Sequence, residues 1–286
     1  MKTHNKTHDD HKKTHDDKNL PVKIITSTVL RQMKTAGAKI TCLTAYDATF
    51  AALIDEAGVE VVLVGDSLGM VVQGQTSTLP VTMDAMVYHT TCVTRGIRRA
   101  LLVADLPFLS YTTPERALDN AGRLMAAGAG MVKLEGGSAQ ILEIVYHLGR
   151  WGIPVCAHLG LLPQSVYKSG GYRVQGRDPG QAAVILNAAQ ALEKAGAELL
   201  VLECVPVTLA RRITATLNIP TIGIGAGTHC DGQVLVLYDM LGLTPGKRPK
   251  FSRDFLPGNH SVREAIGTFV RDVKHGIFPG PGNDYH

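Results

Sequence analysis

Short apolar runs alternate with segments of helical period along most of the chain. The runs are rich in Val, Ile, Leu and Ala and end at turns, which is typical of buried parallel strands. The runs that we predict as strands are Ile40–Tyr46, Val59–Gly65, Ala100–Leu106, Gly130–Glu135, Ile153–Leu159, Glu198–Val205, Pro220–Ile224 and Val234–Leu241.

Between these runs, apolar residues recur with the period of an amphipathic helix, and several segments stop at a glycine. The predicted helices are Thr28–Thr35, Asp47–Ala57, Thr82–Arg95, Thr113–Ala127, Ala139–Arg150, Pro179–Ala195, Thr208–Leu217 and Ser261–His275. Leu68–Pro80 and Gly160–Asp178 are predicted loops, and Gly225–Gly232 is a predicted turn. This regular alternation favours an α/β fold, a closed (β/α)8 TIM barrel, over an open doubly wound sheet.

The two ends of the chain differ from this pattern. Residues 1–20 are rich in Lys and His and repeat Lys-Thr-His, with little that is apolar, so we predict a disordered tail. Residues 21–286 are predicted to form a single barrel domain. Its C-terminal helix, Ser261–His275, is expected outside the barrel or on a neighbouring subunit.

Composition narrows the class of protein. The chain is 45% hydrophobic but only 5% aromatic, and its net charge is +4, which is too weak to indicate a nucleic-acid partner. Five cysteines without a C-x-x-C pair indicate reduced thiols. The longest apolar runs are under about ten residues, so we expect no membrane span, and no signal peptide is recognisable. We therefore expect a cytoplasmic protein.

Ionisable residues stand at the ends of five consecutive predicted strands. Carboxyl ends of barrel strands meet at one rim, where barrel enzymes have their active sites. A single charged strand end is commonly a helix cap or a solvated rim residue, but five in succession predict a site. The residues are Asp66, Asp105, Lys133, Glu135, His158 and Glu203.

Three of these residues are carboxylates, which predict a metal site. Asp66, Asp105 and Glu135 supply hard oxygen ligands, and no Cys or second His has ligand spacing, so Mg²⁺ is favoured over Zn²⁺. A 2-keto acid would suit such an ion, because Mg²⁺ polarises the keto group and stabilises an enolate. Lys133 and Ser67 are the candidate contacts of the substrate carboxylate.

Proton removal from the carbon beside the keto group needs a base. Glu203, in Leu-Glu-Cys-Val-Pro, is the first candidate and His158 the second, although His158 also fits a substrate contact or a structural role. Two other interpretations remain open: Lys133 as a Schiff-base lysine without metal, and a barrel that serves only as a scaffold. The run Gly223–Gly227 lacks phosphate-loop spacing and indicates a tight turn or close backbone approach to a cofactor.

Ordered motifs along the chain resemble the ketopantoate hydroxymethyltransferase family. The matching stretches are Leu43–Asp47, Val64–Pro80, Ala104–Phe108, Met131–Gly137, His158–Gly160, Pro163–Val166, Gly170–Gly176, Leu202–Pro206 and Ile222–Gly227. The resemblance covers the chain from about Val22 onward. Isocitrate lyase and phosphonopyruvate relatives use a Lys-Lys-Cys-Gly-His-type loop, which the sequence does not contain.

The resemblance implies a barrel of the phosphoenolpyruvate/pyruvate type and a specific reaction. In this reaction a hydroxymethyl group passes from 5,10-methylenetetrahydrofolate to 3-methyl-2-oxobutanoate, and the product 2-dehydropantoate leads to pantothenate and coenzyme A. The family also implies a large homo-oligomer, a decamer. The residue roles that it implies are direct Mg²⁺ ligation by Asp66 and Asp105, completion of the metal site by Glu135 partly through water, carboxylate contacts by Ser67 and Lys133, the base Glu203, and a substrate-site histidine, His158.

Overall fold

The computed structural model describes residues 24–168, 170–246 and 248–285. Its strands form one closed parallel barrel in chain order, with β1 paired to β8, so the predicted (β/α)8 fold is confirmed and the open sheet is excluded. The predicted tail, residues 1–20, lies outside the described residues. The strands are β1 Ile40–Thr44, β2 Val61–Val64, β3 Leu101–Asp105, β4 Met131–Glu135, β5 Val155–Gly160, β6 Leu199–Glu203, β7 Thr221–Ile224 and β8 Gly232–Leu235.

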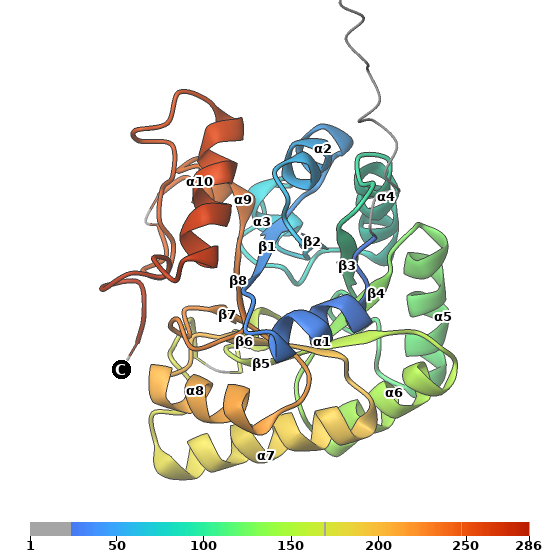
Figure 1. Cartoon of the computed structure of the whole chain (residues 1–286). Coiled ribbons are helices and arrows are strands. Elements are labelled where there is room, and N and C mark those ends of the chain that lie inside the picture. The colour runs from blue at the N-terminus through green and yellow to red at the C-terminus, as the bar shows by residue number, and fades with distance from the viewer. Residues whose placement is uncertain (1–23, 169, 247, 286) are drawn as a thin grey trace, which may run out of the picture.

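An outer layer of helices surrounds the barrel (Figure 1). These helices begin at polar caps, as when the Asp47 side chain accepts hydrogen bonds from the backbone of Thr49 and Phe50. The larger helices are α1 Ser27–Thr35, α2 Ala48–Glu56, α4 Met83–Thr94, α5 Pro114–Ala126, α6 Ala139–Arg150, α7 Pro179–Ala195, α8 Val207–Thr216 and α10 Val262–Lys274. The short ones are α3 Leu68–Val71, the 3₁₀ turn η1 Pro163–Ser165 and α9 Leu237–Met240.

Alternation along each strand sends one set of side chains into the barrel and the other toward the helices. Inside the barrel, Leu30 of α1 packs with strand residues such as Ile40, Met131 and Leu199. Helix α1 thus covers the end of the barrel where the strands begin (Figure 1). The opposite end, where the strands finish, remains available for a site.

The strand-to-helix alternation has one departure. Residues 225–231, all of them described, connect β7 to β8 as a turn without a helix. Helix α10 completes the outer layer by packing against α2 and β1, which is the first of the two positions expected for it. The Nζ atom of Lys274 on α10 lies 2.6 Å from Oε1 of Glu60, the residue before β2, which ties this helix to the sheet.

The predicted eighth strand was wrong at both ends. We expected Val234–Leu241, but β8 is Gly232–Leu235 and the rest of the run forms α9. An apolar run does not by itself distinguish a strand from a buried helical turn. The tertiary structure makes the distinction, because the Leu237 backbone N–H donates to Thr44 Oγ1 at 2.9 Å. The other predicted strands and helices lie within two residues of the observed ones.

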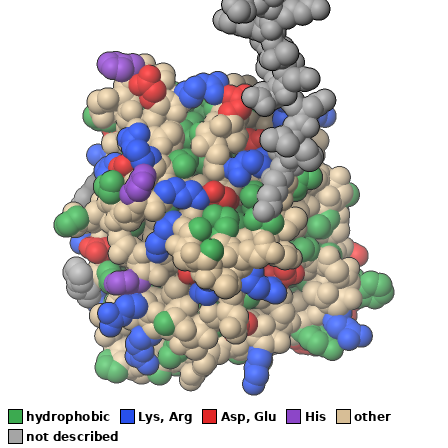
Figure 2. Space-filling view, in the orientation of Figure 1, with side chains coloured by type: hydrophobic (Ala, Val, Ile, Leu, Met, Phe, Trp, Pro, Cys, Tyr) green, Lys and Arg blue, Asp and Glu red, His purple; other side chains and the backbone are tan. Residues whose placement is uncertain are grey.

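Surface features add little to this picture. On the face shown in Figure 2, Lys and Arg side chains are dispersed among Asp and Glu side chains. In the described part of the chain, no helix combines the length and the apolar character needed to cross a membrane.

Candidate active site

The strand register places the predicted ionisable residues next to one another at the carboxyl end of the barrel. In the parallel pairing, Asp105 lies opposite Lys133, Glu135 opposite His158, and Gly160 opposite Glu203. Lys133 and Glu135 are two residues apart on β4, so both side chains point into the barrel. All of these groups therefore meet at one rim.

A cavity of about 520 Å³ opens at this rim. Much of its wall is apolar, with side chains such as Val201, Ile224 and Val234. The C-terminal segment contributes Phe251 and Tyr285. The sequence-predicted site residues all line it: Asp66, Ser67, Asp105, Lys133, Glu135, His158 and Glu203.

The carboxylates are buried close to one cation. Lys133 Nζ lies 3.1 Å from Asp105 Oδ1, and Asp105 Oδ2 accepts a hydrogen bond of 3.0 Å from the Asp66 backbone N–H. Burial raises the pKa of Asp66 to about 8, and the charges of Asp105 and Glu135 add to this effect. Burial also raises the pKa of Asp105, against the opposing effect of Lys133. Asp66 therefore retains its proton to a higher pH than an exposed aspartate does.

Lys133 remains a cation in this setting. Burial acts to lower the pKa of its ammonium group, but the charges of Asp105, Glu135 and Asp66 outweigh burial and hold the pKa above its ordinary value. Its side chain is 6% exposed, so its charge acts mainly on the cluster and on whatever occupies the cavity.

His158 lies between two glutamates. Its Nδ1 is 3.5 Å from Glu135 Oε1 and its Nε2 is 3.2 Å from Glu203 Oε2, although neither contact has the angles of a hydrogen bond. Burial and Lys133 act to lower the pKa of the imidazole, but the two glutamates outweigh them and raise it to about 9. The imidazole is therefore charged at neutral pH and links β4 to β6 electrostatically.

Two glycines allow the backbone to form this rim. A Cβ atom on Gly65 would lie 2.7 Å from Ser67 Oγ, which instead hydrogen-bonds the Tyr46 hydroxyl at 2.9 Å. Gly160 has a φ of +99°, and a Cβ atom there would lie 2.1 Å from the Glu203 carbonyl oxygen. The close approach of β5 to β6 therefore requires glycine beside the candidate base.

The model of one protein family matches residues 24–281, and its description is ketopantoate hydroxymethyltransferase. The chain belongs to the ketopantoate hydroxymethyltransferase family. It is 60% identical over 256 residues to the 3-methyl-2-oxobutanoate hydroxymethyltransferase of Nitrosococcus oceani, covering 89% of this chain and 97% of that protein. It is 58% identical over 262 residues to the protein of the same name from Methylococcus capsulatus, covering 91% of this chain and 97% of that protein. The chain is thus an enzyme of the transferase class, and the resemblance found in the sequence is confirmed.

Solved structures with a similar barrel have lower sequence identity. Phosphonopyruvate hydrolase in complex with oxalate and Mg²⁺ has a TM-score of 0.58 at 13% identity, covering 91% of this chain and 93% of that chain. For 2,3-dimethylmalate lyase, a member of the PEP mutase/isocitrate lyase superfamily, the TM-score is 0.56 at 15% identity, covering 90% and 99%. These likenesses show that this chain shares their fold.

The donor set at the rim fits a divalent cation with few protein ligands. Asp105 Oδ1 is buried with Lys133 Nζ as its charged partner at 3.1 Å, and burial together with the charges of Asp105 and Glu135 raises the pKa of Asp66, so a cation at the rim would favour the ionised form of Asp66. Across those residues, no three His, Cys, Asp or Glu side chains converge as a preformed metal cage. Mg²⁺ suits such a site, because it keeps several water ligands and needs only one or two carboxylates.

Sequence reasoning missed Gln164 and Tyr111. The Gln164 amide nitrogen donates to Asp66 Oδ2 at 2.8 Å, and Tyr111 donates to Gln164 Oε1 at 2.5 Å. Both lie in connections after strands and not at a strand end, so the strand-end pattern does not find them. Gln164 does fall within one of the family motifs, Pro163–Val166, which was the available signal.

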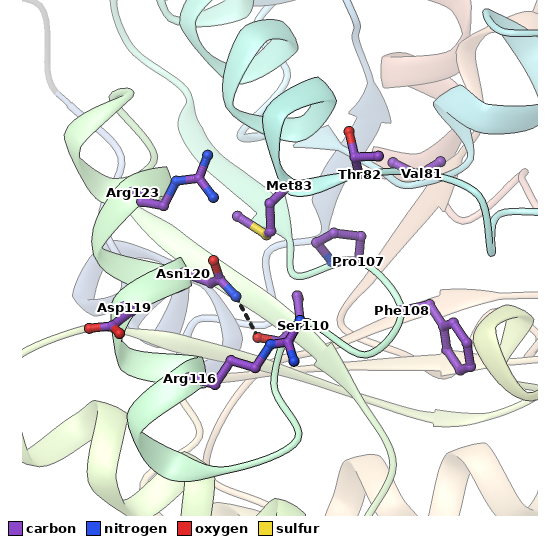
Figure 3. Close-up of a pocket in the computed structure, with 10 residues that line it drawn as sticks. All are labelled: Val81, Thr82, Met83, Pro107, Phe108, Ser110, Arg116, Asp119, Asn120 and Arg123. Carbon is purple, nitrogen blue, oxygen red and sulfur yellow. Dashed lines mark hydrogen bonds between the residues drawn. The ribbon is translucent and has the colours of Figure 1, made fainter.

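A second cavity, of about 400 Å³, lies outside the barrel between the start of α4 and α5 (Figure 3). It has Arg116 and Arg123 in its wall, and Asn120 Nδ2 donates to the Ser110 carbonyl at 2.7 Å. It contains none of the strand-end acids, so its lining offers no comparable set of acids and bases for the ketopantoate hydroxymethyltransferase reaction.

Proposed function

We propose that this protein transfers a hydroxymethyl group from 5,10-methylenetetrahydrofolate to 3-methyl-2-oxobutanoate and forms 2-dehydropantoate, a step toward pantothenate and coenzyme A. Family membership supports the reaction. The observation that carries the proposal is that three carboxylates, a buried lysine and the Glu203–His158 pair line one cavity. Following the family resemblance, we also propose that it is cytoplasmic and assembles as a homo-oligomer.

The acid cluster would hold Mg²⁺ at the rim. Asp66 and Asp105 would be direct ligands, and Glu135 would complete the site partly through water. When bound, Mg²⁺ polarises the keto oxygen of the substrate and makes the C–H bond beside the keto group more acidic.

The chain's own residues bind the keto acid and move its proton. Lys133, which stays charged, and Ser67 would contact the substrate carboxylate. Glu203 would accept the proton from the branched carbon, because its side chain is 13% exposed and lines the cavity. His158, charged and 3.2 Å from Glu203 Oε2, would hold this carboxylate in place and leave Oε1 for the proton.

Carbon–carbon bond formation then joins the branched carbon to the one-carbon unit of the folate. Both bonds from the one-carbon unit to the two folate nitrogens break in the overall reaction, and water supplies the hydroxyl oxygen. Tetrahydrofolate leaves with two protons on these nitrogens, one from the branched carbon and one from the water. The apolar wall of the cavity excludes other water from the deprotonated substrate, which limits its reprotonation.

A Schiff-base mechanism at Lys133 is the alternative that the sequence left open. A nucleophilic lysine must be neutral, whereas three carboxylates stabilise the charged form of Lys133. This charge supports the carboxylate-binding role instead. Borohydride treatment with 3-methyl-2-oxobutanoate distinguishes the two, because a covalent adduct on Lys133 would favour the Schiff base.

The decisive experiment measures exchange of the C3 proton of 3-methyl-2-oxobutanoate with solvent in Mg²⁺ and without folate. Glu203→Gln should retain binding of the keto acid and Mg²⁺ but lower the exchange rate by about 10²–10⁴-fold, the usual contribution of a general base. Glu143→Gln, at an exposed position on α6, is the matched control. Exchange at the normal rate in the Glu203 variant would show that Glu203 is not the base.

A further inference from the structure

Gln164 and Tyr111 contact the acid cluster but have no part in the proposed proton transfer. The Gln164 side-chain nitrogen donates to Asp66 Oδ2 at 2.8 Å and to the Leu106 carbonyl at 3.0 Å. Its backbone N–H donates to Glu135 Oε2 at 3.1 Å. One residue, 6% exposed, therefore holds an oxygen atom of two of the three carboxylates.

Tyr111 determines the orientation of the Gln164 side-chain amide. The Glu135 backbone N–H can only donate, so the Tyr111 hydroxyl accepts from it at 3.3 Å and gives its own proton to Gln164 Oε1 at 2.5 Å. With Oε1 occupied, the amide nitrogen must face Asp66 and Leu106. The amide cannot turn over without losing several buried hydrogen bonds.

This arrangement commits one oxygen of each of the three carboxylates to a hydrogen bond. Gln164 takes Asp66 Oδ2 and Glu135 Oε2, and the Asp66 backbone takes Asp105 Oδ2. Within the described part of the chain, Asp66 Oδ1 accepts no hydrogen bond, and Asp105 Oδ1 has Lys133 Nζ as its ion-pair partner at 3.1 Å. We propose that Gln164, held by Tyr111, is a positioning residue that fixes Asp66 and Glu135 for a divalent cation. This inference rests on the proposed function.

The size of the effect follows from similar contacts in other metal sites. Loss of a group that orients a metal ligand typically lowers metal affinity by about 10–100-fold. Gln164→Met keeps the length of the side chain but removes its polar atoms, so it should show this loss. Tyr111→Phe keeps the Gln164 amide and removes only the group that orients it, so its loss should be smaller, roughly tenfold or less.

The test uses the full chain freed of metal and Mn²⁺ as the probe, with free Mn²⁺ measured by electron paramagnetic resonance. We expect the Kd for Mn²⁺ to rise about 10–100-fold in Gln164→Met and less in Tyr111→Phe. The matched controls, Gln32→Met on α1 and Tyr146→Phe on α6, carry exposed side chains and should bind as the unaltered chain does.

A second measurement separates positioning from a general loss of structure. In Tyr111→Phe, raising the Mn²⁺ concentration should restore C3 proton exchange to nearly the full rate, so that the half-saturating concentration changes and the maximal rate does not. A purely structural role would lower the maximal rate with the fraction of folded protein and leave the half-saturating concentration unchanged. Circular dichroism and thermal unfolding in EDTA give that folded fraction.

Each result has a distinct meaning. Unchanged Mn²⁺ affinity in a folded Gln164→Met protein would overturn the positioning role while the proposed function stands. If Gln164→Met does not fold, Tyr111→Phe decides, and unchanged affinity there overturns the role. If the unaltered chain did not bind Mn²⁺, the metal site in the proposed function would be wrong, and this inference would fail with it.

Discussion

Lys133 provides the sharpest test of the electrostatics at the rim. Lys133→Met preserves the shape of the side chain but removes the ammonium group that lies 3.1 Å from Asp105 Oδ1. With all groups ionised, Asp66, Asp105 and Glu135 contribute −3 while Lys133 and His158 contribute +2, so the substitution changes the net charge of the cluster from −1 to −2.

The magnitude follows from the geometry. A charge pair at this distance and an effective dielectric constant of about 20 gains about 5 kcal/mol, and breaking a buried pair typically costs about 3–5 kcal/mol. At roughly 2–4 °C per kcal/mol for a chain of this size, the midpoint of thermal unfolding in EDTA should fall by roughly 6–20 °C at about pH 8.

The loss should depend on pH in a defined direction. Burial already raises the pKa values of Asp66 and Asp105, and Lys133 opposes that rise. Without Lys133 the folded variant binds more protons than the unaltered protein, so its relative stability decreases as the pH increases. We therefore expect a smaller loss at about pH 5.5 than at about pH 8, because Asp66 is protonated at the lower pH.

The assay measures thermal unfolding of Lys133→Met at these two pH values. The control variant breaks another lysine–aspartate ion pair, at the other end of the barrel. Lys34 Nζ lies 2.7 Å from Asp231 Oδ2, and Asp231 also accepts hydrogen bonds from the Thr221 backbone and hydroxyl. Lys34→Met removes a partly buried lysine outside the acid cluster, so its loss should vary little with pH. Equal losses at both pH values in Lys133→Met would refute the like-charge argument.

Three further outcomes follow from the same site. The Mg²⁺ affinity of the unaltered protein should rise as the pH increases toward about 8, because Asp66 must release its proton to bind the ion. Calorimetry measures this affinity, and a flat profile between about pH 6 and pH 8 would contradict the prediction. By the same linkage, Asp66 makes the metal-free protein less stable as the pH rises from about 4 to about 8. Gly160→Ala should cost about 2–4 kcal/mol in unfolding free energy and slow C3 proton exchange, because its Cβ atom would displace Glu203. Gly152→Ala, at a φ of +77° with open space around it, measures the cost of backbone strain alone, and an equal loss in both variants would exclude the proposed displacement.

The sequence alone was enough to locate seven of the eight strands and the ionisable residues at their ends. A period of two places Lys133 and Glu135 on the same face of one strand, whatever lies around it. Closure of parallel strands in chain order then brings Asp66, Asp105 and Glu203 to the same rim. These properties depend on local geometry and on one topology, so the pattern of the chain determines them.

Only the tertiary structure showed how the rim is held together. Gln164 and Tyr111 are 53 positions apart in the chain and meet through side-chain hydrogen bonds. Leu237 ends the eighth strand by bonding to Thr44, a partner 193 positions away. The charge state of His158 likewise depends on Glu135 and Glu203 from the two neighbouring strands. Such contacts depend on distances between segments that are remote in sequence, and no local period encodes those distances.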